Sequence, residues 1–92
     1  MKFYYDTQSI SLKDEHENVL AYIQFPQGDD GIIVITHTFV DERLRGQHVA
    51  AQLMEKAVDY LKAHGKTFRV SCSYAEMWVK QHPHECEGLV IK

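Results

Sequence analysis

The stretch that decides the fold is residues 32–50, IIVITHTFVDERLRGQHVA. Its first part, residues 32–40, is an unbroken β-branched run, which is typical of a strand buried on both faces in the middle of a sheet. A polar turn that contains Gly46 follows, and the chain then changes from strand to helical periodicity. Strand, turn and helix in direct succession predict the first half of a βαβ crossover.

A stripe of apolar residues predicts the helix after this turn, with the spacing of an amphipathic helix, at positions 50, 53, 54, 57, 58 and 61. We expect a helix of about 18 residues that stops at Gly65. Residues 67–72 predict a strand parallel to residues 32–40, because such crossovers join parallel strands. Val40, Cys72 and the helix N-terminus should then lie at one edge of the sheet, where ligands of open α/β sheets bind.

The rest of the chain predicts shorter elements. Alternating apolar residues before a turn at 28–31 predict strands over residues 3–6, 9–13 and 19–25. A second helix is expected from residue 73 or 74 to Gln81, stopped by Pro83. The apolar residues 88–91 either add a terminal strand or pack on a partner.

Length and charge exclude several classes of protein. The chain has 92 residues and a formal net charge of −3, from 10 Lys and Arg against 13 Asp and Glu. This length suits one small domain, residues 1–92, and this charge gives no electrostatic reason to bind nucleic acid or an anionic membrane. The longest aliphatic run, residues 32–35, is too short for a membrane span. Two cysteines and an N-terminus without a secretory pattern predict a cytoplasmic protein with reduced thiols.

The turn from Arg43 to Ala50 is the first candidate site. A glycine-containing turn before a helix exposes backbone N–H groups and the positive end of the helix dipole, which suits a phosphate or pyrophosphate. Arg43 and Arg45 strengthen that preference for an anion. The alternative is a helix N-terminus whose charged residues are simply solvated, and the residues alone leave both interpretations open.

Residues 35–54, ITHTFVDERLRGQHVAAQLM, resemble motif A of the GNAT superfamily of N-acetyltransferases. More narrowly, the chain resembles the minimal YjdJ-type GNAT-like proteins, which have about this length, an equivalent His-Thr-x-Val segment, an Arg-Gly-Gln turn and a Ser-Cys-Ser strand end. The resemblance is strongest over residues 35–82. It implies an α+β fold with a mixed, mostly antiparallel sheet, one parallel βαβ crossover and two helices, in the order β-β-β-α-β-α.

The same resemblance implies a cofactor, acetyl-CoA, wedged between the strands that end at Val40 and Cys72, with its pyrophosphate on the amides of residues 45–50. His48 stands where the superfamily pattern usually has its second glycine. Its side chain restricts φ and fills space near the pyrophosphate, or else its imidazole donates to the phosphate. The cofactor-binding residues implied are Phe39, Val40, Arg45, Gly46, Gln47, His48, Val49 and Ala50.

Three residues are candidate catalytic groups. The resemblance implies that Cys72 accepts the acetyl group or belongs to the thioester pocket, whereas an unpaired cysteine is often only a small buried apolar residue. His37 could act as base or orienting partner beside Cys72, or be a core histidine bonded to backbone. Tyr74 resembles the hydroxyl donor that protonates the departing CoA thiolate, or it simply packs. Asp41 and Glu42 are interpreted mainly as solvated loop charges.

The segment from His82 to Cys86, HPHEC, contains three potential metal ligands at His82, His84 and Cys86. The spacing permits a zinc hypothesis, but a second pair of ligands at standard spacing is lacking. An incidental, solvated cluster is the better interpretation, and no metal is expected. Trp78 and Met77 are most simply core or interface residues.

Together these features predict an enzyme that transfers an acetyl group from acetyl-CoA to an amine of a small molecule or a protein. Transfer would occur directly or through an acetyl-Cys72 intermediate. The alternative is a non-catalytic module that binds CoA or acyl-CoA, or another protein. A monomer and a homodimer are both compatible with the small size and the apolar tail.

Overall fold

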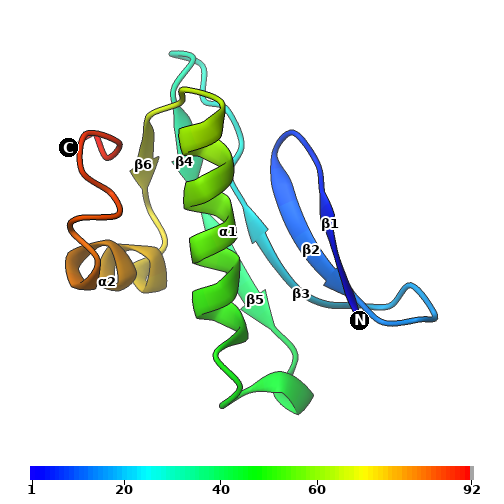
Figure 1. The fold of residues 1–92 in the computed structure, drawn as a ribbon. Helices are drawn as coiled ribbons and strands as arrows, with labels where there is room; N and C mark the ends of the chain where they lie inside the picture. Colours follow the sequence, from blue (N-terminus) through cyan, green and yellow to red (C-terminus); the bar gives the residue numbers. More distant parts are fainter. Residues whose placement is uncertain (92) are drawn as a thin grey trace.

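The computed structural model describes residues 1–91, in which a long helix lies across one face of a sheet (Figure 1). The N-terminal strands form an antiparallel hairpin at one side of the sheet, and the second helix lies at the other side (Figure 1). The elements are β1 (Lys2–Tyr5), β2 (Ser9–Lys13), β3 (Val19–Gln24), β4 (Ile33–Ile35), β5 (His37–Val40), a 3-10 turn η1 (Glu42–Leu44), α1 (Val49–Ala63), β6 (Phe68–Val70) and α2 (Ser73–Gln81).

The strands form two hydrogen-bonded groups, called the antiparallel ladder and the parallel ladder below. One has the order β1-β2-β3-β5 and is antiparallel throughout, and the other pairs β4 with β6 in parallel. In the parallel ladder Ile33 faces Phe68 and Ile35 faces Val70, with α1 as the connection. The α+β class, the mostly antiparallel sheet, the parallel crossover and the two helices are therefore confirmed.

The prediction of one unbroken strand over residues 32–40 is wrong. The backbone N–H of Thr36 donates to the carbonyl of Gln24 at 3.0 Å, while His37 is the register partner of that same Gln24. Thr36 and His37 therefore both oppose the single residue Gln24, and this arrangement is a β-bulge. Ile33 and Ile35 are buried before the bulge, whereas Thr38 and Val40 are the more buried residues after it. The bulge divides the run into β4 and β5, so five strands precede α1 instead of the three in the order β-β-β-α-β-α.

Helix α1 is built on the predicted apolar stripe. Its buried residues include Leu53, Met54, Ala57, Val58 and Leu61, and the solvent-facing residues between them are polar. The helix has 15 residues, somewhat fewer than predicted, and Gly65 follows its end with a φ of 66°. That left-handed conformation is the one glycine adopts most easily, so Gly65 ends the helix as expected. No helix within residues 1–91 is long and apolar enough to cross a membrane.

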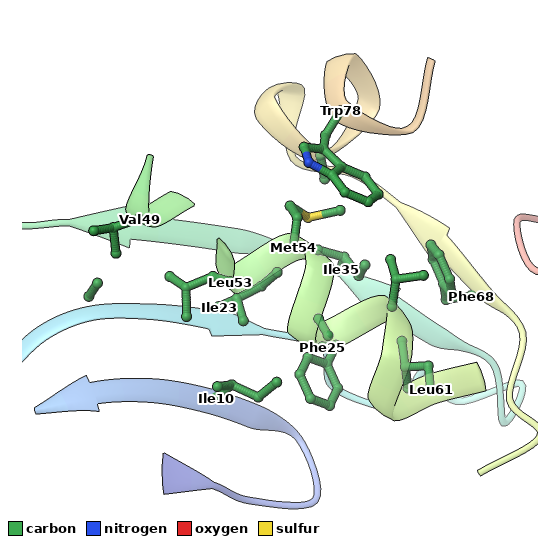
Figure 2. Packing of buried hydrophobic residues seen from close by; sticks show 14 of the residues in the cluster. Ile10, Ile23, Phe25, Ile35, Val49, Leu53, Met54, Leu61, Phe68 and Trp78 are labelled. Carbon is green, nitrogen blue, oxygen red and sulfur yellow. The ribbon is translucent and has the colours of Figure 1, made fainter. Parts of the chain in front are cut away.

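Helix α2 and the C-terminal tail complete the core. Trp78 of α2 packs beside Met54 of α1, and Phe68 of β6 is fully buried near them (Figure 2). The tail follows the free edge of β6: Phe68 N–H donates to the Leu89 carbonyl, and Ile91 N–H donates to the Phe68 carbonyl, both at 2.8 Å. The tail thus forms a parallel bridge through Val90, and it extends the sheet as one of the two alternatives predicted.

Candidate functional site

The sheet splits at the end of β4. Ser71 N–H donates to the Ile35 carbonyl at 3.0 Å, and Cys72 N–H approaches the same oxygen at 3.4 Å. Beyond Ile35 the parallel ladder ends, because β5 turns with β3 while the chain after β6 enters α2. Val40 and Cys72 do lie on adjoining segments, but their strands diverge and do not pair as the sequence predicted. The result is a gap between β5 and the start of α2.

Backbone groups of β5 face this gap. Asp41 N–H donates to the Leu20 carbonyl at 2.7 Å, and Phe39 is the register partner of Tyr22. Bonded pairs recur at every second residue of an antiparallel ladder, so the N–H groups of Thr38 and Val40 point away from β3. These donors are oriented to receive an acceptor that lies between the two ladders.

Cys72 stands on the other side of the gap, as the N-cap residue of α2. Its sulfur lies 3.6 Å from the Thr38 hydroxyl oxygen. Partial burial raises the pKa of the thiol, but the backbone N–H groups of Ala75, Tyr74 and Thr38 and the Thr38 hydroxyl together outweigh it. The net pKa therefore falls below the ordinary 9.0, although no complete capping hydrogen bond forms. A thiol at a helix N-terminus is activated in this way.

Tyr74 is half-buried in the first turn of α2. Burial raises the pKa of its phenol, and the nearby charge of the Cys72 thiolate raises it further. The hydroxyl therefore keeps its proton at neutral pH, which suits a proton donor.

His37 and Phe39 lie elsewhere. Both are exposed, on the face of β5 opposite to Thr38 and Val40, and the Phe39 ring stacks on Tyr22 at 5.4 Å. Thr38, and not His37, is the residue of β5 that contacts Cys72. The sequence analysis placed His37 beside Cys72. It did not foresee the bulge at Thr36, which shifts the alternation by one residue and left no recognisable signal in the sequence.

The turn before α1 contains two residues in the left-handed conformation. Gly46 has a φ of 83°, and His48, the N-cap of α1, has φ 60° and ψ 26°. His48 thus adopts the left-handed conformation that glycine takes most easily, and histidine adopts it more readily than most other residues.

The first turn of α1 is left open to a ligand. The side chain of His48 makes no capping hydrogen bond, and the first turn has no acidic residue. The first bond into the helix runs from Gln52 N–H to the His48 carbonyl, so the N–H groups of Val49, Ala50 and Ala51 have no partner within residues 1–91. Free amides at the positive end of a helix favour an anion.

A pocket of about 180 Å³ lies over this helix start. Six of the eight predicted cofactor-binding residues line it, Phe39 and Gln47 being the exceptions, and Tyr74 reaches it from α2. Leu44 and Ala51 line it without having been predicted. The full lining is Val40, Leu44, Arg45, Gly46, His48, Val49, Ala50, Ala51 and Tyr74.

The two arginines of the turn differ. Arg43 Nε lies 3.0 Å from Asp41 Oδ1, and this hydrogen bond is the main reason why the pKa of Asp41 is lowered. Arg43 is therefore already paired with a carboxylate. Arg45 lines the pocket and is exposed. The anion preference that the sequence assigned to both arginines rests on Arg45.

The segment from His82 to Cys86 has a structural role. The ring of His82 stacks on Trp78 at 4.0 Å, with its Nδ1 2.8 Å from the Trp78 carbonyl oxygen, and Cys86 is buried in the core. Within residues 1–91 no group of three His, Cys, Asp or Glu side chains is placed to hold a metal ion. The zinc hypothesis therefore finds no support in the geometry.

The family model of GCN5-related N-acetyl-transferases matches residues 9–89. The chain belongs to this family. It is accordingly an acyltransferase of the GNAT superfamily, as its sequence suggested.

Individual proteins are similar to this chain in sequence or in fold. Protein NATD1 of Danio rerio is 26% identical over 76 residues, which make up 83% of this chain and 67% of that protein. A GCN5-like protein of Staphylococcus aureus shares the fold with a TM-score of 0.76 and 23% identity, over 98% of this chain and 87% of the other. A ribosomal-protein-alanine N-acetyltransferase of Brucella melitensis biovar Abortus gives a TM-score of 0.51 at 17% identity, over 82% of this chain but 59% of that larger one.

We predict opposite effects on stability for two substitutions in the turn. His48→Gly should increase the free energy of unfolding by about 0.5–1 kcal/mol, because relief of left-handed strain exceeds the added chain entropy. Gly46→Ala should lower it by a similar amount, although a Cβ there meets no atom within 4 Å. Urea denaturation measures both. A loss of stability in His48→Gly would show that the imidazole makes a favourable contact.

The two cysteines should differ in reactivity with iodoacetamide. The thiolate is the reactive form, so the pKa of Cys72, lowered from 9.0, gives it a larger reactive fraction at neutral pH. Burial, together with the charge of Glu85, raises the pKa of Cys86 and makes it slow to react. Peptide mass spectrometry over a pH series should give a midpoint for Cys72 below 9.0. Equal rates for the two thiols would contradict the assigned environments.

Proposed function

We propose that this chain is a minimal, YjdJ-type member of the family that transfers an acetyl group from acetyl-CoA to an amine. The observation that carries the proposal is the convergence of two helix N-termini on the split in the sheet. The free amides of α1 and Tyr74 of α2 line one pocket, and Cys72 faces β5 beside it. One site thus combines an anion-binding region with an activated thiol.

The pyrophosphate of acetyl-CoA would bind at the start of α1. The amides of Val49, Ala50 and Ala51 would donate to its oxygens, and Arg45 would add a charge-assisted contact. The pocket is smaller than the roughly 300 Å³ of ordinary small-molecule sites, so the rest of the cofactor would extend along the gap. His48 has an exposed side chain beside the pocket, from which its imidazole could reach a phosphate.

The gap would hold the thioester. The N–H groups of Thr38 and Val40 would polarise the carbonyl oxygen, in the manner of an oxyanion hole. The thiolate of Cys72 would attack the carbonyl carbon, forming a new thioester as the bond to the CoA sulfur breaks. Tyr74 would protonate the CoA thiolate. The neutral amine would then attack acetyl-Cys72, forming the amide and restoring the thiolate, while its proton passes to a base.

His37 remains our candidate for that base. Its imidazole is exposed on the face of the sheet opposite to Thr38, next to the rings of Phe39 and Tyr22. An acceptor amine that approached over this face would meet His37 before the gap, because no helix within residues 1–91 covers the rings there. Asp41 is less suitable, since its carboxylate is bound to Arg43.

Binding tests the first half of the proposal. Arg45→Ala should weaken the affinity for acetyl-CoA by about three- to tenfold, the effect of one lost, partly solvated charge contact. Arg43→Ala is the matched control and should change it by less than about twofold, because Arg43 is bound to Asp41. Thermal shift titration with acetyl-CoA and with CoA measures both. An equal loss in the two variants would contradict the assignment of the pyrophosphate site.

Acetylation of Cys72 tests the second half. After incubation with acetyl-CoA and no amine, peptide mass spectrometry should find one acetyl group on Cys72. Cys72→Ala should lose the adduct and at least about 100-fold in turnover over a panel of primary amines, the scale of one lost catalytic group. Cys86→Ala, which removes the buried thiol, should keep both.

Two other outcomes would each favour an alternative to the covalent route. Absence of the adduct with unchanged turnover in Cys72→Ala would exclude the covalent route and favour direct transfer. Stabilisation by acetyl-CoA without CoA release on any amine would favour a module that only binds the cofactor.

A further inference from the structure

Thr38 belongs to the His-Thr-x-Val segment of residues 37–40, but the sequence analysis assigned it no role. It lies in the middle of β5, opposite Ile23, and its side chain is half-buried. Its hydroxyl oxygen lies 3.6 Å from the Cys72 sulfur. Within residues 1–91 this is the one side-chain hydrogen bond between β5 and the segment after β6. This hydroxyl therefore links the side chains on the two sides of the split sheet, and the backbone N–H of Thr38 also approaches the sulfur.

The direction of this hydrogen bond depends on the state of the thiol. A neutral thiol and a hydroxyl can each donate, but a thiolate has only acceptor positions. When Cys72 is ionised, the Thr38 hydroxyl must therefore be the donor. The other neighbours of the Cys72 sulfur, the backbone N–H groups of Ala75, Tyr74 and Thr38, are donors as well.

Few charged groups compete with this contact. On α2, burial keeps Tyr74 protonated at neutral pH, and Glu76 in the first turn is exposed to solvent. On β5 the nearest titratable residue is His37, which faces the opposite side. The first residues of α1, 49–54, have no titratable side chain, and Arg69 of β6 is paired with Asp30 at 2.7 Å. The hydrogen-bond donors thus dominate the surroundings of the sulfur.

We propose that Thr38 is a positioning residue for Cys72: its hydroxyl donates to the thiolate and holds the sulfur in the gap beside the N–H groups of β5. The proposal rests on the proposed use of Cys72 in acyl transfer. In that reaction the hydroxyl acts chiefly in the second half. The bond between the acyl carbon and sulfur breaks, the sulfur takes the electron pair, and a donor at the sulfur makes it a better leaving group.

Threonine suits this position for two reasons. Its β-branched side chain favours a strand, and its methyl group fills space that a smaller serine would leave empty. Valine has the same shape without the hydroxyl, so it separates hydrogen bonding from packing. Serine keeps the hydroxyl and loses the methyl group, so the two variants form a matched pair.

The test is the pH profile of Cys72 alkylation by iodoacetamide in Thr38→Val and Thr38→Ser, followed by peptide mass spectrometry. Thr38→Val should shift the midpoint to higher pH and slow the reaction at neutral pH by about tenfold or more, as expected for one lost hydrogen bond to a charged group. Thr38→Ser should keep the midpoint of the unmodified chain. An unchanged profile in Thr38→Val, or an equal shift in both variants, would overturn the proposal.

Two controls separate this role from a structural one. The buried Cys86 in the same sample reports unfolding, and it should stay slow to react in every variant. If Thr38→Val exposes Cys86, Thr38→Ala removes the hydroxyl without placing a methyl group in its position, and it should shift the profile in the same direction. The measurement needs no turnover. A shifted alkylation profile in Thr38→Val, together with full activity in Cys72→Ala, would support the role of Thr38 as a positioning residue. It would contradict only the covalent route of acyl transfer.

Discussion

Gln24 opposes both Thr36 and His37 across the antiparallel ladder, and the strands can accommodate this extra residue only by bending. The parallel pairing of β4 with β6 therefore ends at Ile35, where one carbonyl receives the N–H of Ser71 and approaches that of Cys72. Past this point β5 stays with β3, and the chain after β6 turns into α2. The gap, the N–H groups of β5 that point away from β3 and the contact between Thr38 and Cys72 all depend on that single inserted residue.

Two helices begin at this gap, and both present the positive end of their dipole to it. Helix α1 starts without a capping side chain or an acidic residue in its first turn, and α2 starts at Cys72, whose thiol lies among backbone N–H groups. Each arrangement favours a negative charge, a phosphate at α1 and a thiolate at α2. A chain with a net charge of −3 thus gains a local preference for anions from backbone dipoles and Arg45. Net charge alone would have excluded such a site.

Much of the site could be predicted because its signals are local. The helix start is marked by a glycine turn and an apolar stripe, and six of the eight residues assigned to the cofactor line one pocket. The errors have two sources, one local and one that depends on register between strands. The sequence analysis counted Arg43 toward the preference for an anion, but the Arg43 guanidinium is paired with Asp41, two residues away. His37 was placed beside Cys72 on the assumption that the two parallel strands are neighbours, and the bulge gives that position to Thr38.

The sequence by itself determined the class of the fold, the order of its helices and the location of the glycine turn before α1. These follow from periodicity, from Gly46 and Gly65, and from the motif over residues 35–54, all of which act within a few residues of the chain. Only the tertiary structure decided where the sheet splits and which side chain meets the thiol. A β-bulge changes the faces of every following residue in its strand, yet it depends on register between strands far apart in the sequence.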